Sequence, residues 1–270
     1  MLQNLHTHTN MCDGNNTAEE MIEGALALGF DSLGFSAHFP TVFRTDWELR
    51  DLEEYSKKIF ELKEKYCDRI KIYLGAELDY YSVPKPASVK FDYTIGSVHM
   101  YKVGDEPIDF DNTAEISRKN INEFFGGDSG AYVKAYYSLV ASLAEKIDFD
   151  IVGHFDLITK FSEKHPDLFD RDSDEYKKTA LEALHALREK KELFEVNTGA
   201  ISRGHRTSPY PAPFILDEMK RLKCKLVLTS DSHEISSLNS HFSEAKEYVK
   251  AHGFDTLYHL TDNGFDGEKI

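Results

Sequence analysis

Short apolar segments alternate with amphipathic segments along the whole chain, and this alternation limits the folds open to it. The apolar segments have the length and composition of buried strands. They are residues 2–8, 32–38, 72–79, 93–99, 150–156, 193–199 and 225–233, with a weaker one at 256–261. Strands that alternate with helices form parallel sheets whose neighbouring strands are joined by crossover helices. The sequence therefore predicts an α/β protein.

The amphipathic segments carry apolar residues at helical spacing. They are residues 17–29, 49–66, 130–146, 174–191, 213–223 and 242–253. Thr17 and Glu20 have the spacing of a capping box at the start of the first. Seven or eight strand–helix units in 270 residues fit a (β/α) barrel better than an open sheet. No linker rich in Pro, Gly or Ser divides the chain, so we expect a single domain over residues 1–270.

Composition restricts the possible partners. The formal net charge of −15 argues against a protein that tracks nucleic-acid phosphates, because such proteins need a basic face. No apolar stretch is long enough to cross a membrane, and the N-terminus lacks the pattern of a signal peptide. The 3 cysteines are scattered, which is typical of a reduced protein. We expect a cytoplasmic protein that binds neither nucleic acid nor membrane.

Potential metal ligands stand at the ends of these strands. His6 and His8 are two residues apart, as are Asp231 and His233, so each pair leaves one face of an extended segment. The candidate ligands are His6, His8, Asp13, His38, Glu77, His99, His154, Asp231 and His233. In a parallel barrel the carboxyl ends of all strands meet at one mouth. A single strand-end histidine is more often structural than a ligand, but the joint pattern predicts a metal centre.

The type and number of candidate ligands indicate which ions they hold. A mixture of imidazole and carboxylate suits zinc, iron or manganese, whereas calcium and magnesium prefer oxygen ligands. One ion with an open position needs only about three or four protein ligands. The candidates therefore predict two or three divalent ions that share carboxylates. Clustered ions of this kind activate water and stabilise in-line displacement at phosphorus.

Two segments do not fit the strand–helix repeat. They are residues 39–50, after the second strand, and residues 103–130, after the fourth. We expect both to be long loops at the mouth of the barrel, where enzymes of this architecture build their active sites. Arg44 and Trp47 in the first segment are candidates for part of a lid over the site.

The ordered motifs HTHTNMCDG, FSAH, GAELDY, IGSVH, GHFD and TSDSH resemble those of the PHP (polymerase and histidinol phosphatase) superfamily. Within it, the segments IYLGAELDYY, DYTIGSVH, IVGHFDLITKF and LFEVNTGAISR look most like the histidinol-phosphate phosphatases of histidine biosynthesis. The resemblance covers nearly the whole chain. It implies a distorted (β/α)7 barrel with a centre of three divalent metal ions, and hydrolysis of L-histidinol phosphate, a small phosphate monoester, by a metal-bridging hydroxide.

The resemblance also implies three ligand sets. The first ion would take His6, His8, Glu77 and Asp231, and the second Glu77, His99 and His154. The third would take Asp13, His38 and His233. Many relatives carry histidine at the place of Asp13, so the third set departs from the usual pattern. An aspartate remains a competent ligand there and adds negative charge.

Other residues are candidates for contact with the substrate. The departing alkoxide needs a proton, and Asp231 or His233 is the expected catalytic residue that routes it. Candidates for the phosphate and the rest of the substrate are Glu115, Arg118, Lys160, Asn197, Arg203 and His205. The basic residues suit phosphate oxygens, and Glu115 suits an ammonium or imidazole group. For each basic residue, an ordinary surface salt bridge is an equally good interpretation.

Four other functions compete with this one. A phosphoesterase of the same superfamily could act on another small monoester or a nucleotide. A polymerase-associated nuclease or accessory module is disfavoured by the acidic charge, and a non-catalytic metal sensor by the complete ligand set. An amidohydrolase barrel also begins with His-x-His but usually carries a metal-bridging lysine. The corresponding strand ends here carry Glu77 and His99 instead.

Overall fold

The computed structural model describes all residues, 1–270, and contains seven parallel strands in the order β1-β2-β3-β4-β7-β8-β9. The strands are β1 (Gln3–Asn4), β2 (Ser32–Phe35), β3 (Lys71–Asp79), β4 (Tyr93–Ser97), β7 (Ile151–Val152), β8 (Leu193–Asn197) and β9 (Lys225–Thr229). A parallel bridge joins Thr7 to Ser232 beyond the ends of β1 and β9. The amide of His8 donates to the Ser232 carbonyl at 2.8 Å, and that of Ser232 to the His6 carbonyl at 3.1 Å. The ring is thus completed by one short contact, which confirms the predicted distorted (β/α)7 barrel.

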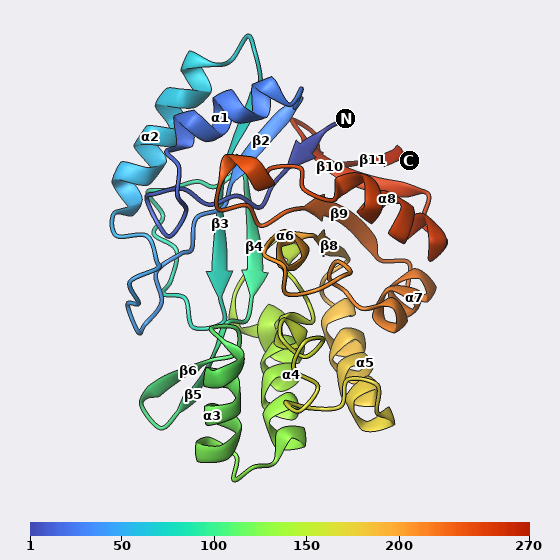
Figure 1. Cartoon of the computed structure of the whole chain (residues 1–270). Coiled ribbons are helices and arrows are strands. Elements are labelled where there is room, and N and C mark those ends of the chain that lie inside the picture. Colours follow the sequence, from blue (N-terminus) through green and yellow to red (C-terminus); the bar gives the residue numbers. More distant parts are fainter.

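Helices surround the strands (Figure 1). They are α1 (Ala18–Ala27), α2 (Leu52–Lys65), α3 (Ala114–Phe124), α4 (Ser129–Lys146), α5 (Asp174–Arg188), α6 (Gly199–Ser202), α7 (Pro213–Arg221) and α8 (Phe242–Ala251). Two short 3₁₀ helices, Leu157–Thr159 and Ile235–Ser237, follow β7 and β9. The capping box is confirmed: the Glu20 amide donates to Thr17 Oγ1 at 3.2 Å, and the Thr17 amide donates to Glu20 Oε2 at 2.8 Å. None of these helices is long and apolar enough to span a membrane.

Residues 103–130 are not the long loop that we expected. An antiparallel hairpin, β5 (Met100–Val103) and β6 (Glu106–Asp109), begins the segment, and α3 follows it. Gly104 makes the tight turn with a φ of 62°. Thr113 caps α3 by accepting from the Ile116 amide at 3.1 Å, a start signal that is visible in the sequence. In Figure 1 the hairpin and α3 lie beyond the arrowheads of β3 and β4, at the mouth of the barrel. Residues 39–50 do form a loop of turns.

The weak last strand does not join the barrel. It is β10 (Thr256–Thr261), which pairs in antiparallel fashion with β11 (Gly264–Lys269) around a two-residue loop. The side chain of Gln3 bonds both the carbonyl and the amide of Leu260, at 2.9 and 2.8 Å. Tyr73 donates to the same carbonyl at 2.9 Å. The hairpin therefore covers the amino end of the barrel, opposite the mouth.

Apolar side chains fill the amino half of the barrel. Leu5, Tyr73, Tyr93, Ile95, Ile151, Leu193, Val227 and Leu260 form one buried cluster. The side chain of Tyr93 lies so close to Gly34 and Gly75 that a Cβ at either glycine would come within 2.4 Å of it. This tight packing leaves the carboxyl half for the polar side chains at the strand ends.

Candidate metal centre

Glu77 lies at the centre of a histidine cluster in the carboxyl half of the barrel. One carboxylate oxygen lies 2.9 Å from His38 Nδ1 and 3.2 Å from His6 Nε2. The other lies 2.9 Å from His154 Nε2 and 3.4 Å from His99 Nε2, and it accepts from Ser97 at 2.7 Å. Only 1% of the Glu77 side chain is exposed. A carboxylate with histidines on both oxygens has the geometry of a bridging ligand.

A second group lies nearer to solvent. Asp13 Oδ2 is 3.1 Å from His233 Nε2 and 3.5 Å from His38 Nε2, and Asp13 Oδ1 is 3.6 Å from His8 Nδ1. The side chains of Asp13 and His233 are 29% and 25% exposed. Asp13 comes from the loop between β1 and α1, and His233 from the segment after β9. The two strand-end loops therefore complete one side of the cluster.

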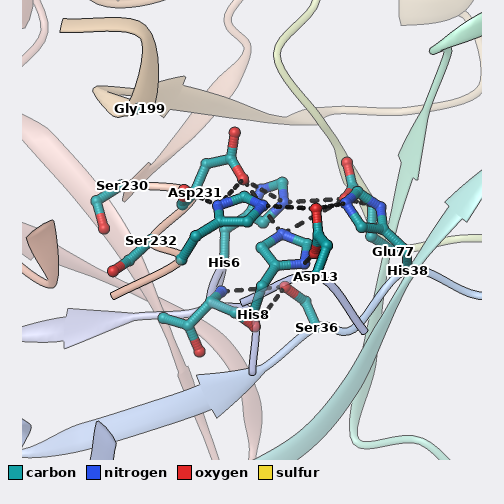
Figure 2. A network of polar contacts seen from close by, with 12 residues as sticks. His6, His8, Asp13, Ser36, His38, Glu77, Gly199, Ser230, Asp231 and Ser232 are labelled. Atoms are coloured by element: carbon teal, nitrogen blue, oxygen red, sulfur yellow. Dashed lines mark hydrogen bonds and ion pairs between the residues drawn. The ribbon is translucent and has the colours of Figure 1, made fainter. Parts of the chain in front are cut away.

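Asp231 connects the two groups (Figure 2). Its Oδ1 lies 3.2 Å from His8 Nε2 and 3.5 Å from His6 Nε2, while its Oδ2 accepts from Arg203 at 2.8 Å. The backbone of Asp231 has a φ of 49°, which is uncommon for a residue other than glycine. Such conformations concentrate at functional sites, where the surroundings impose them. The structure thus brings all nine expected ligands into one cluster.

Several buried atoms of the cluster lack hydrogen bonds within the protein. They are His6 Nε2, His8 Nε2 and Glu77 Oε2, and the carboxylate oxygen lies 3.2 and 3.7 Å from the two nitrogens. Buried polar groups normally have hydrogen-bond partners. Potential metal-ligand atoms that lack such partners and lie close together therefore indicate that an ion binds between them. Four groups of residues each offer ligand atoms that lie within 4.8 Å of one another inside the group. The groups are His8, Asp13, His38 and His233; His6, His8 and Glu77; His6, His154 and Asp231; and His38, Glu77 and His99. The residues present therefore fit divalent metal binding.

The same contacts shift the protonation equilibria of the ligands. Burial opposes ionisation of Glu77 and Asp231, but the neighbouring histidines, and Arg203 beside Asp231, hold the pKa of both carboxyls well below the usual range. Burial, together with His233 and His38, lowers the pKa of His8 to about 3. The carboxylates are therefore charged and His8 is neutral. In the metal-free protein the nearby carboxylates, against the effect of burial, raise the pKa of His6, His38 and His99. Metal binding would displace these protons.

A cavity of about 330 Å³ opens onto the cluster. Beyond the ligands it is lined by Trp47, Asp109, Asp111, Asn112, Lys160 and Arg203. Trp47, one of the two lid candidates, lies with its ring 4.7 Å from that of His38. Arg44, the other, is absent from the cavity lining. The volume is at the lower end of the range of about 300–1,000 Å³ that is usual for small-molecule sites. The cavity has room for a small ligand in contact with the cluster.

The other expected substrate contacts lie in different environments. Arg203 and Lys160 line the cavity, and His205 packs against Phe161 with 5.0 Å between ring centres. Arg118 lies on α3 and bonds Asp167 at 2.9 Å, and neither it nor Glu115 lines the cavity. Both residues lie on α3, the helix that occupies the segment where we expected a loop. Asn197 is buried and donates to Glu195 at 3.2 Å.

Sequence reasoning missed three groups beside the cluster. Asp109 and Asp111 line the cavity at the end of the β5–β6 hairpin. Burial and the neighbouring Asp111 raise the pKa of Asp109. Glu195 lies beneath His6, with Oε1 2.6 Å from His6 Nδ1. An acidic residue inside the apolar strand LFEVN was a readable signal, because charged side chains are rarely buried without a partner.

Comparison with known proteins agrees with the fold and the ligand pattern. The sequence matches the PHP domain over residues 4–199. The chain is 28% identical over 271 residues to a probable histidinol-phosphatase of Schizosaccharomyces pombe, covering 92% of this chain and 85% of that protein. It is 27% identical over 251 residues to the histidinol-phosphatase of Bacillus subtilis, covering 85% and 92%.

Solved structures of similar fold include the histidinol phosphate phosphatase of Lactococcus lactis, in complex with zinc, L-histidinol and phosphate. Its TM-score is 0.73 at 22% identity, and the match covers 98% of each chain. A putative histidinol phosphatase from Listeria monocytogenes also gives 0.73 at 22% identity, covering 90% of this chain and 99% of that one. The strand-end ligands, the barrel and the sequence match agree, and the chain belongs to the PHP domain family.

Proposed function

We propose that this protein is a metal-dependent phosphatase that hydrolyses L-histidinol phosphate to L-histidinol and inorganic phosphate. The relatives named histidinol-phosphatase match most of the chain. The observation that carries the proposal is the polarity of the cavity. The cavity is lined by members of the ligand cluster and also by Asp109 and Asp111. Histidinol phosphate has a matching polarity, with a phosphate at one end, an ammonium on the neighbouring carbon and an imidazole at the other end.

The ligand cluster would hold three divalent ions, with zinc as the first candidate because the Lactococcus lactis structure contains it. The proposed ligand sets are His6, His8, Glu77 and Asp231; Glu77, His99 and His154; and Asp13, His38 and His233. Bound ions of this kind lower the pKa of water and neutralise charge on phosphoryl oxygens. The anionic end of the substrate would therefore face an attractive wall in an otherwise acidic protein.

Arg203 and Lys160 are the protein groups that we assign to the phosphate. Arg203 lies beside Asp231 and also donates to the Asp231 carbonyl at 2.9 Å, so its guanidinium is fixed at the cavity wall. Lys160 donates to the carbonyl and carboxylate of Asp111, at 2.8 and 3.1 Å. Fixed cations recognise phosphate with little loss of side-chain freedom. Asp231 and His233 line the same cavity and are the groups that route a proton to the departing alkoxide.

Asp109 is the group that we assign to the substrate's ammonium. Its carboxylate has only the amide of Asn112 as a side-chain partner, at 3.3 Å, whereas Asp111 is paired with Lys160. Burial and the charge of Asp111 disfavour the anion of Asp109 and raise its pKa, and a bound cation would relieve both effects. Asp109 therefore takes the role that the sequence suggested for Glu115.

Phosphate release from several esters tests the proposal. The metal-loaded protein is given L-histidinol phosphate, glycerol 3-phosphate, a nucleoside monophosphate and a phosphodiester. We expect histidinol phosphate to have by far the highest kcat/KM and the diester to be inert. Equal rates for the monoesters would favour the alternative, a phosphoesterase of broader or different specificity.

The variant Asp109→Asn separates recognition from chemistry. A hydrogen bond to a charged group contributes about 1.5–3 kcal/mol, or roughly 10- to 150-fold. We expect kcat/KM for histidinol phosphate to fall by this factor, while that for glycerol 3-phosphate, which has no cation, stays unchanged. The matched control is Asp105→Asn, because Asp105 is a fully exposed aspartate in the turn of the same hairpin. An equal loss for both substrates would contradict the assignment of Asp109.

A further inference from the structure

Glu195 is a fully buried carboxylate directly behind the ligand cluster. It lies in β8, and none of its side chain is exposed. Oε1 is 2.6 Å from His6 Nδ1. Oε2 accepts from the backbone amide of His154 at 2.9 Å and from the side chain of Asn197 at 3.2 Å. Both oxygens are therefore engaged, and they connect three strands of the barrel.

These contacts determine how two of the ligands are presented. A carboxylate only accepts hydrogen bonds, so His6 Nδ1 carries the proton and His6 Nε2 offers its lone pair to the cluster. The bond to the His154 amide fixes the backbone from which the second imidazole projects. His6 and His154 have ring centres 5.8 Å apart. One side chain thus sets both the direction of His6 and its separation from His154.

The other ligands have longer contacts behind them. His99 Nδ1 lies 3.4 Å from Asp79 Oδ2, and His8 Nδ1 lies 3.6 Å from Asp13 Oδ1 and 3.7 Å from the Cys12 thiol. His154 Nδ1 makes no hydrogen bond. No lysine or arginine pairs with Glu195; its three partners are an imidazole, a backbone amide and a side-chain amide. Burial of a carboxylate is costly unless positive charge compensates it. An ion held by His6 would supply the compensating charge through this imidazole.

We propose that Glu195 is a positioning residue that orients His6 and His154 and thereby sets the affinity of the metal ions that these two imidazoles hold. Asn197, which the sequence suggested as a substrate contact, supports it: its Oδ1 accepts from the Gly199 amide at 2.9 Å while its Nδ2 holds Glu195. This inference rests on the metal centre proposed above but not on the identity of the substrate.

Zinc affinity of the variant Glu195→Gln tests the inference. The glutamine amide carries no charge. Its NH₂ group would face either the N–H of His6 or the two amides, of His154 and Asn197, that donate to Oε2. Changing such a partner typically weakens metal binding by about 10- to 100-fold. We expect a loss of this size for the tightest ion, measured by competition with a chromogenic chelator. The kcat should recover when zinc is in excess, since Glu195 does not line the cavity.

Glu218→Gln is the matched control. Glu218 also contacts a histidine, His185, but that imidazole is 49% exposed and far from the cluster in the fold. The zinc affinity of the Glu218→Gln variant should equal that of the wild type. Wild-type affinity in Glu195→Gln, with only a lower Tm of the metal-free protein, would overturn the inference. If Glu195→Gln does not fold, Glu195→Asp, which keeps the charge on a shorter side chain, must show the same weakening. A wild type that binds no zinc would instead refute the proposed function.

Discussion

The inner and outer parts of the ligand cluster differ in how the fold holds them. The inner ligands are His6, His8, Glu77 and His154, whose side chains are between 0% and 3% exposed. The rim ligands are Asp13 and His233, which are 29% and 25% exposed. Glu77 lies within β3, and Asp13 lies nine residues beyond β1. His8 and His233 both lie four residues beyond their strands but are 0% and 25% exposed. Burial therefore separates the two groups, and distance from the strand does not.

The difference in burial suggests that the inner ligands mainly bind metal and that the rim groups mainly contact the substrate. Inner ligands lose their hydration and are satisfied by each other, by Glu195 and by an ion, so a change there affects metal binding first. Rim groups and Arg203 line the cavity, where we propose that the substrate binds. We therefore expect inner substitutions to remove metal and activity together, and rim substitutions to lower activity while most of the metal remains.

Glu77→Gln should have the largest effect. Glu77 approaches five histidines, and removal of its charge leaves them without a bridging anion. We expect loss of bound metal and a fall in kcat/KM of more than about 100-fold, the upper end for residues behind the ligands. Elemental analysis and phosphate release measure the two effects on one preparation. Full metal content with lost activity would contradict the inner role of Glu77.

Arg203→Ala should have an intermediate effect. Its guanidinium bonds Asp231 Oδ2, while Asp231 Oδ1 faces His6 and His8. We expect kcat/KM to fall by roughly 10- to 150-fold through a lost charged contact with phosphate, with metal content unchanged. Arg203→Lys should recover part of the loss, because it restores charge without the planar fork. Loss of metal in Arg203→Ala would place this residue among the groups that hold the ions.

Glu218→Gln should have the smallest effect, and it shows what a histidine–carboxylate contact does away from the cluster. Hydrogen bonds from Arg221, together with His185, lower the pKa of Glu218 from its usual value to about 2. Because the pKa is lowered on folding, the stabilisation is complete above about pH 5 and disappears as the pH falls toward 2. We expect the variant to be less stable by about 1 kcal/mol at neutral pH.

Denaturant unfolding of both proteins between pH 2 and 7 measures this difference. The gap between wild type and variant should close as the pH falls through the titration of Glu218. A constant gap would mean that the contact contributes no pH-dependent stability.

The sequence predicted the inner part of the site better than its surroundings. Strand ends converge in any parallel barrel, so the pattern of strand-end histidines was enough to place His6, His38 and His154 together. Position in the chain says nothing about where a loop folds back, and Glu115 and Arg118 were therefore expected at the cavity although α3 carries them away from it. Asp109 reaches the cavity because an unrecognised hairpin ends beside it.

Two other features were visible but were interpreted incompletely. Thr113 had the character of an N-cap, and the segment after it repeats buried residues at helical spacing. Residues 256–261 have strand composition, but a barrel strand cannot be distinguished from a hairpin strand by composition alone. The two-residue turn at Asp262 and Asn263, followed by Gly264 with a φ of 105°, decides between them by reversing the chain.

Titration of the metal-free protein with zinc tests the central claim most directly. Bound zinc per chain and phosphate release from L-histidinol phosphate are measured at each step. We expect no activity without metal, and full activity only when more than one ion is bound per chain. Equal hydrolysis by the metal-free protein, or no hydrolysis by the fully loaded protein, would contradict it.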